Sequence, residues 1–208
     1  MFKNFISRKF PLDGIYNGHH QVTYRGVPAA KCPFDYVIYQ MIVHEVKPDL
    51  ILEIGTRNGG SALYLADLLS MTGQGKIHTV DLPANKENQA LHTHGRISIF
   101  KEGYENYDIG QLENFRKIIV IEDGSHMYAD SLRCLQLFSP FVSADSYYIA
   151  EDGIVNELGR EAEFDGGPVR AIKEFLKTDS RFIIDDKWTS FFGKNATFNI
   201  NGYLKRIR

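Results

Sequence analysis

The chain has 208 residues with 24 basic and 26 acidic side chains, and its formal net charge is -2. This size and a hydrophobic content of 43% predict one globular domain with a substantial core. The charge balance gives no reason to expect nucleic-acid or anionic-membrane binding, and no apolar run approaches the roughly 20 residues of a membrane span. Cys32 and Cys134 lie far apart without metal-binding spacing, so we expect both to be reduced and the protein to be cytoplasmic.

Residues 1–30 are expected to form an N-terminal arm, and residues 31–208 a single domain. The arm begins with aromatic residues among charges and lacks the long apolar segment of a secretory signal. Its large apolar residues could pack on this chain or on a second copy, which makes a homo-oligomer plausible. They are Phe2, Phe5, Ile6 and Phe10.

The rest of the sequence alternates between helical and strand-like patterns. A helix is expected over 33–46, ending before Pro48. Strands are predicted at 50–54, 76–81, 97–100, 118–121, 146–150, 182–184 and 201–207, with helices at about 60–71, 104–115, 127–139 and 167–178. This alternation predicts an α/β fold. Its mostly parallel seven-stranded sheet would have helices on both faces and an antiparallel edge formed by the last two strands.

The turn after the first predicted strand reads Glu53-Ile54-Gly55-Thr56-Arg57-Asn58-Gly59-Gly60-Ser61. Dinucleotide-binding folds use G-x-G-x-x-G to close the backbone on a pyrophosphate, whereas this turn is E-x-G-x-x-x-G. A wider turn suits a ligand without phosphate there, such as S-adenosylmethionine. Glu53 could accept a hydrogen bond from its ammonium group, and Gly55, Thr56, Gly59 and Ser61 would contact it. An ordinary strand–turn–helix remains the alternative.

Acidic residues lie at the ends of four of the predicted strands, and ligands bind at the carboxyl ends of such strands. Asp81 is placed to bind the two ribose hydroxyls of an adenosine, with Leu82 beside it. Its alternative role is a turn or cap acid. Asp123, Glu151 and Asp152 are three hard oxygen donors, a set that favours Mg²⁺ or Mn²⁺ over Zn²⁺. The alternative is that Glu151 or Asp152 caps the turn before Gly153.

The histidines lie in different predicted elements of the chain. His126 follows Asp123 at a strand–helix junction, so it could be a ligand, a base or a cap. His19-His20 and His92-Thr93-His94 lie in polar loops and are expected to be solvated. His44 and His78 lie within regular elements and are expected to be structural.

Several further motifs match a known family in order along the chain. They are Gly26-Val27-Pro28 with Lys31, Tyr39-Gln40, Lys47-Pro48-Asp49-Leu50, Glu53-Ile54-Gly55-Thr56, Gly59-Gly60-Ser61-Ala62, Val80-Asp81, Asp123, His126, Glu151-Asp152, Gly167-Pro168, Ala171-Ile172 and Gly202-Tyr203-Leu204. On these residues the chain resembles the cephalosporin hydroxylase family, which also covers rhamnosyl O-methyltransferase-like proteins. The resemblance implies a Rossmann-like class I methyltransferase fold and a Mg²⁺-dependent S-adenosylmethionine methyltransferase activity, with Asp123, Glu151 and Asp152 as metal ligands. One segment departs from the family: Glu122-Asp123-Gly124-Ser125-His126 stands where we expect Leu-Asp-Ser-Asp-His.

We therefore expect an O-methyltransferase that acts on a hydroxyl of a small molecule or sugar, in particular a vicinal diol. Asp123 would touch both cofactor and metal, and His126 is the candidate base. The alternatives are a metal-dependent hydroxylase, a nicotinamide-dependent dehydrogenase and a non-catalytic S-adenosylmethionine-binding module. The acceptor pocket is expected to involve loops 83–95 and 154–165 and the arm. Three aromatic residues are expected either to stack on a sugar ring or to form a hydrophobic plug: Trp188, Phe191 and Phe192.

Overall fold

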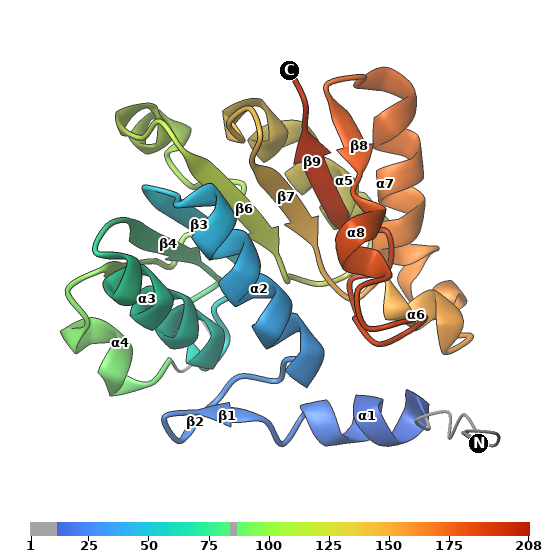
Figure 1. Cartoon of the computed structure of the whole chain (residues 1–208), viewed down its shortest axis with the longest axis horizontal. Coiled ribbons are helices and arrows are strands. Elements are labelled where there is room, and N and C mark those ends of the chain that lie inside the picture. Colours follow the sequence, from blue (N-terminus) through green and yellow to red (C-terminus); the bar gives the residue numbers. More distant parts are fainter. Residues whose placement is uncertain (1–11, 84–86) are drawn as a thin grey trace, which may run out of the picture.

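The computed structural model describes residues 12–83 and 87–208. Its centre is a seven-stranded sheet in the order β5-β4-β3-β6-β7-β9-β8 (Figure 1). The strands are β3 (Leu50–Ile54), β4 (Lys76–Val80), β5 (Ile97–Phe100), β6 (Ile118–Glu122), β7 (Tyr147–Ala150), β8 (Phe182–Ile184) and β9 (Tyr203–Arg206). The first five are parallel, and β9 runs antiparallel to both β7 and β8. The predicted fold class is confirmed, with the antiparallel strand second from the edge.

Helices cover both faces of this sheet (Figure 1). They are α2 (Pro33–Val46), α3 (Gly60–Thr72), α4 (Gln89–Thr93), α5 (Tyr128–Phe138), α6 (Ile154–Glu157), α7 (Gly167–Thr178) and α8 (Asp186–Thr189). In β3, Ile51 packs in the cluster that contains α2 and α3, whereas Leu52 packs in the cluster of α5 and α7. Both side chains are fully buried, which explains why the strand is apolar at successive positions rather than at alternate ones. Truncating Leu52 to alanine should cost about 2–5 kcal/mol of stability.

The segment 104–115 was predicted to be a helix, and this prediction is wrong. Only a 3-10 helix, η1 (Ile109–Asn114), forms there, with Asp108 accepting from the Gly110 backbone N–H at its start. Tyr107 is buried with its hydroxyl 2.6 Å from His78 Nδ1, so tertiary packing fixes this segment. The acidic segment expected to be a loop at 154–165 contains α6 and a 3-10 turn, Glu161–Phe164, and α4 lies within the polar loop 83–95.

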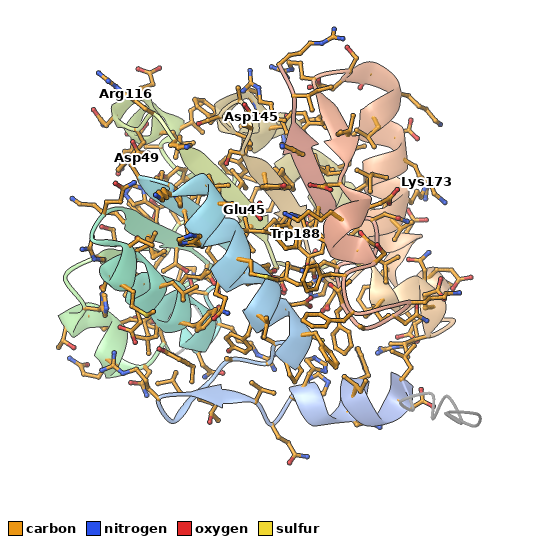
Figure 2. The ribbon with its side chains drawn as sticks, in the orientation of Figure 1. Glu45, Asp49, Arg116, Asp145, Lys173 and Trp188 are labelled. Carbon is orange, nitrogen blue, oxygen red and sulfur yellow. The ribbon has the colours of Figure 1, made fainter. Side chains whose placement is uncertain are left out.

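Different parts of the chain lie beyond the amino ends and the carboxyl ends of the strands. At the amino ends, Asp49 accepts from the backbone N–H groups of Arg116 and Lys117, which ties β3 to β6. Asp49 and Arg116 lie at the end of the sheet opposite α1 (Figure 2). At the carboxyl ends lies the first part of the chain, with α1 (Leu12–His19) and the hairpin of β1 (Thr23–Tyr24) and β2 (Val27–Pro28) (Figure 1). This arrangement places the N-terminal segment beside the edge where ligands bind in such folds.

Two expectations concern the start of the chain and the membrane. The apolar residues Phe2, Phe5, Ile6 and Phe10 lie outside the described residues. Within residues 12–83 and 87–208, no helix has both the length and the apolar character that a membrane crossing requires.

Candidate active site

A cleft of about 570 Å³ lies at the carboxyl ends of the parallel strands. Its walls come from the turns after β3, β4, β5, β6 and β7, together with α1. Among the predicted site residues, the lining includes Gly55, Thr56, Ser61, Asp81, Leu82, Asp123, His126 and Asp152. The volume is in the range of small-molecule sites, and the cleft can hold a ligand of nucleoside size.

The glycines of the turn between β3 and α3 have different structural roles. Gly55 has φ +106, and a Cβ there would lie 2.0 Å from the carbonyl oxygen of Asp123, so only glycine lets the two loops cross. Gly59 has φ +89 at the start of α3 and faces the Leu91 side chain rather than the cleft. Gly60 and Ser61 do line the cleft, where the exposed N–H groups of a helix start favour negative charge. Gly59 thus shapes the turn without contacting a ligand.

Glu53 does not lie where the sequence suggested. It is fully buried beneath the cleft: its Oε1 accepts from Ser61 Oγ at 2.5 Å and its Oε2 from Thr79 Oγ1 at 2.6 Å. The buried carboxylate does not line the cleft, and its two bonds brace the turn against β4. The bracing role is what the structure shows, and a contact between Glu53 and a ligand ammonium stays a prediction.

Asp81 is held ready for a ligand by the backbone. Its Oδ2 accepts from the Arg57 N–H at 2.6 Å and its Oδ1 from the Leu82 N–H at 2.7 Å. The side chain stays partly exposed at the cleft wall, and Leu82 beside it is 62% exposed. A carboxylate fixed in this way keeps free lone pairs for two hydroxyl donors.

The turns after β6 and β7 bring three predicted residues together. Ligand atoms of Asp123, His126 and Asp152 all lie within 4.8 Å of one another. His126 Nε2 is 3.3 Å from Asp152 Oδ2 and 3.8 Å from Asp123 Oδ1. His126 and Asp152 both have left-handed backbones, with φ 59 and φ 57, which is strain of the kind found at functional sites. Burial raises the pKa of Asp152.

Glu151, the third predicted ligand, is engaged elsewhere. Its Oε1 accepts from Lys31 Nζ at 2.5 Å and from the Tyr39 hydroxyl at 2.6 Å. Lys31 also donates to Asp123 Oδ2 at 2.8 Å, so this buried ammonium lies between two of the three predicted acids. Sequence reasoning assigned no role to Lys31 or Tyr39, although both stand in matched motifs, because their acidic partners are 92 to 120 positions away.

Histidines of α1 form another wall of the cleft. His19 is buried and His20 is exposed, and both line the cleft together with Tyr16. Burial lowers the pKa of His19, while the carboxylates of Asp152 and Asp123 act in the opposite direction, which places this wall near them. The expectation of two solvated histidines is therefore wrong for His19.

The aromatic residues between β8 and β9 do not reach the cleft. Trp188 is buried in the core cluster of α2 and α3, on the α8 segment (Figure 2). Phe191 and Phe192 are 45% and 43% exposed and pack on each other. The plug alternative describes Trp188, and none of the three lines the cleft.

A doubly wound sheet in this strand order, an acid at the end of β4 and a carboxylate cluster after β6 and β7 define a class I methyltransferase. Sequence comparison then gives the family: the model described as Rhamnosyl O-methyltransferase/CmcI matches residues 17–207. The chain belongs to this family. The predicted family and enzyme class, an S-adenosylmethionine-dependent O-methyltransferase, are thereby confirmed.

Individual relatives agree with this placement. A rhamnosyl O-methyltransferase of Mycobacterium bovis (strain BCG / Pasteur 1173P2) is 32% identical over 186 residues, covering 79% of this chain and 74% of its own. One from Mycobacterium leprae (strain TN) is 27% identical over 216 residues, covering 94% and 92%.

Solved structures share the fold at lower identity. The structure of cmcI-D160 with Mg and SAM has a TM-score of 0.67 at 21% identity, covering 100% of this chain and 89% of its own. The O-methyltransferase from Bacillus cereus in complex with SAH has a TM-score of 0.56 at 16% identity, covering 86% and 84%.

Proposed function

We propose that this protein transfers the methyl group of S-adenosylmethionine to a hydroxyl of a sugar or small molecule that carries a second hydroxyl beside it. The observation that carries the proposal is one continuous cleft with Asp81 on one wall and Asp123, His126 and Asp152 on another. Relatives named rhamnosyl O-methyltransferases support a sugar acceptor. Neighbours solved with Mg, SAM and SAH support both cofactors.

The cleft fits S-adenosylmethionine in shape and in donors and acceptors. Asp81, fixed by two backbone N–H groups, would hold the ribose hydroxyls, and Leu82 would cover the nucleoside. Gly60 and Ser61 at the start of α3 would face the methionine carboxylate. Gly55 and Thr56 complete this wall, while Glu53 and Gly59 support it from behind.

The acids after β6 and β7 fit a divalent ion. Asp123 and Asp152 would hold it, and oxygen donors favour Mg²⁺ or Mn²⁺. Glu151 remains the predicted third ligand, and its joining would require it to exchange Lys31 for the ion. When bound, Mg²⁺ lowers the pKa of a hydroxyl that it touches, and S-adenosylmethionine supplies an electrophilic methyl carbon.

The chain's own residues do the remaining work. His126 Nε2 faces the acids and can take the proton that leaves the acceptor hydroxyl, and Asp152 stabilises the imidazolium that results. Lys31 holds Asp123 in place through its 2.8 Å bond. The α1 wall of Tyr16, His19 and His20 encloses the acceptor end and limits the access of water.

A methylation assay tests the proposal. A rhamnoside with a free vicinal diol and its monodeoxy analogue are incubated with protein, S-adenosylmethionine and Mg²⁺, and S-adenosylhomocysteine formation is followed by mass spectrometry. We expect O-methylation of the diol, little of the deoxy analogue, and none in excess EDTA. A product methylated on nitrogen or carbon, or full turnover in EDTA, would contradict the proposal. Binding of S-adenosylhomocysteine without turnover on any diol would favour a non-catalytic binding module.

A further inference from the structure

Glu122 carries a buried oxygen that makes no hydrogen bond within the described residues, although the Ser131 hydroxyl lies beside the carboxylate. It is the last residue of β6 and is 1% exposed. Its Oε1 accepts from the Gly124 N–H at 3.2 Å, whereas Oε2 has no hydrogen-bond partner among the described residues. The residue nevertheless lines the cleft. An unpaired buried carboxylate oxygen is costly, so one that faces a ligand cleft indicates a donor on the ligand.

The position of Glu122 identifies the end of the cleft that it faces. Val120 and Glu122 point to the same side of β6, the side that packs on α5. Cys134 of α5 packs in the same cluster as Val120, so it lies on the side of β6 to which Glu122 points. Cys134 lines the cleft together with Tyr104, which follows β5.

The two ends of the cleft are lined by side chains of different chemical character. Asp123, His126 and Asp152 mark the end where the methyl group meets the acceptor, as the proposed function requires. Asp81 would hold the ribose between the two ends. The adenine, on the far side of the ribose from the methyl group, then falls at the end formed by Leu82, Tyr104 and Cys134.

We infer that Glu122 Oε2 accepts a hydrogen bond from the exocyclic 6-amino group of adenine and makes the site selective for adenosine over nucleosides with a 6-oxo group. The inference rests on the proposed function for the identity of the cofactor. A 6-oxo group would put an acceptor against an acceptor, which leaves both unsatisfied.

The test is calorimetric titration of the full-length protein with S-adenosylhomocysteine and S-inosylhomocysteine, which differ only in the 6-position and the adjacent ring N–H. The wild type should prefer the adenosine compound by about tenfold or more. Glu122→Leu should lose most of this preference, chiefly by weaker binding of S-adenosylhomocysteine. Glu122→Gln keeps the shape and an acceptor oxygen, so it should retain more of the preference.

A second measurement separates binding from folding. Because Oε2 is unpaired in the ligand-free protein, Glu122→Leu should keep or raise the melting temperature while it weakens binding, a combination that a purely structural role would not give. Asp81→Ala serves as the control, since it should weaken both compounds equally.

Three results would overturn the inference. An unchanged preference in Glu122→Leu would mean that a water satisfies Oε2, together with the Ser131 and Tyr148 hydroxyls, which also lack partners. Equal losses for both compounds in Glu122→Leu would assign Oε2 to the methionine ammonium. Equal binding of S-adenosylhomocysteine and S-inosylhomocysteine by the wild type would also exclude the hydrogen bond between Glu122 and the 6-amino group. Failure of the wild type to bind S-adenosylhomocysteine at all would instead contradict the proposed function.

Discussion

Lys31 Nζ donates a 2.5 Å hydrogen bond to Glu151 Oε1, although the two residues are 120 positions apart in the chain. Lys31 is 2% exposed, and burial alone would lower its pKa. The carboxylates of Asp123 and Glu151 reverse this effect and raise the pKa of Lys31 well above its ordinary value. The site therefore contains its own cation, which relieves the repulsion expected among the acids at the strand ends.

Lys31→Met should make the stability of the protein depend on a divalent ion. Removing the ammonium leaves two carboxylates without their buried partner, at a cost of about 3–5 kcal/mol. We expect a melting temperature several degrees below wild type in EDTA, and a larger gain on adding Mg²⁺ than wild type shows, since the ion replaces the lost charge. Differential scanning calorimetry measures both.

Lys187→Met is the matched control for Lys31→Met. Lys187 pairs with Glu45 at 2.6 Å on the surface, where both side chains are about half exposed. Such a pair contributes about 0–1 kcal/mol. A Lys31 variant that melts like this control in EDTA would show that the buried ammonium does not stabilise the site.

The set of metal ligands can be decided by Mn²⁺ titration followed by electron paramagnetic resonance. Asp123→Asn and Asp152→Asn should each weaken binding by about tenfold or more. Because Mg²⁺ and Mn²⁺ prefer oxygen, Glu151→Gln should also weaken it, whereas His126→Ala should leave affinity within about threefold and lower the rate by about 10²-fold or more. The reverse pattern would put His126 in the ligand set in place of Glu151.

Much of the fold follows from local pattern, because strands buried on both faces are apolar at most successive positions. The strand from 50 to 54 and the helix from 167 to 178 were predicted with the bounds that the structure has. The segment 104–115 failed because a helical pattern there is overridden by the contact of Tyr107 with His78, which joins residues 29 positions apart. Helix propensity depends on the local sequence and does not account for such long-range contacts.

The candidate site was predictable to the extent that strand ends determine it. Asp81 and Asp123 follow their strands directly, Asp152 comes two positions after β7, and all three line the cleft. Glu53 also ends a strand region, but its side chain points to the face covered by α3, where Ser61 binds it. The side to which a strand residue points is fixed by the register of the whole sheet, and the partner of a buried acid such as Glu151 by tertiary packing.

Asp81→Ala should weaken the binding of S-adenosylhomocysteine. The carboxylate is held by two backbone N–H groups, and each hydrogen bond to a charged acceptor contributes about 1.5–3 kcal/mol. Calorimetry should therefore show a loss of at least tenfold. Asp108→Ala is the control: Asp108 also accepts from a backbone N–H, that of Gly110, but does not line the cleft. Equal affinities in the two variants would remove Asp81 from the site.

Acid should destabilise the protein partly through His78. Burial lowers the pKa of His78 to about 4 in the folded protein, below the ordinary value of 6.5. Between these values the unfolded chain binds a proton that the folded one does not, so stability falls as the pH drops from 6.5 toward 4. His78→Gln cannot titrate and should show a smaller fall in melting temperature between pH 7 and pH 5. His44→Gln, at an exposed position on α2, should behave as wild type.

Changes in the cleft wall formed by α1 should alter the KM for the acceptor and leave the affinity for the cofactor unchanged. His20 is exposed, lines the cleft and stacks against His19 with ring centroids 3.9 Å apart, so His20→Ala should not disturb the core. Losing an aromatic contact of about 0.5–1.5 kcal/mol should raise the KM for the acceptor about two- to tenfold. The Kd for S-adenosylhomocysteine should stay unchanged, because Asp81 and the turn after β3 hold the cofactor. His44→Ala should alter neither constant. A His20 variant whose cofactor affinity falls while its acceptor KM does not would place α1 over the nucleoside instead.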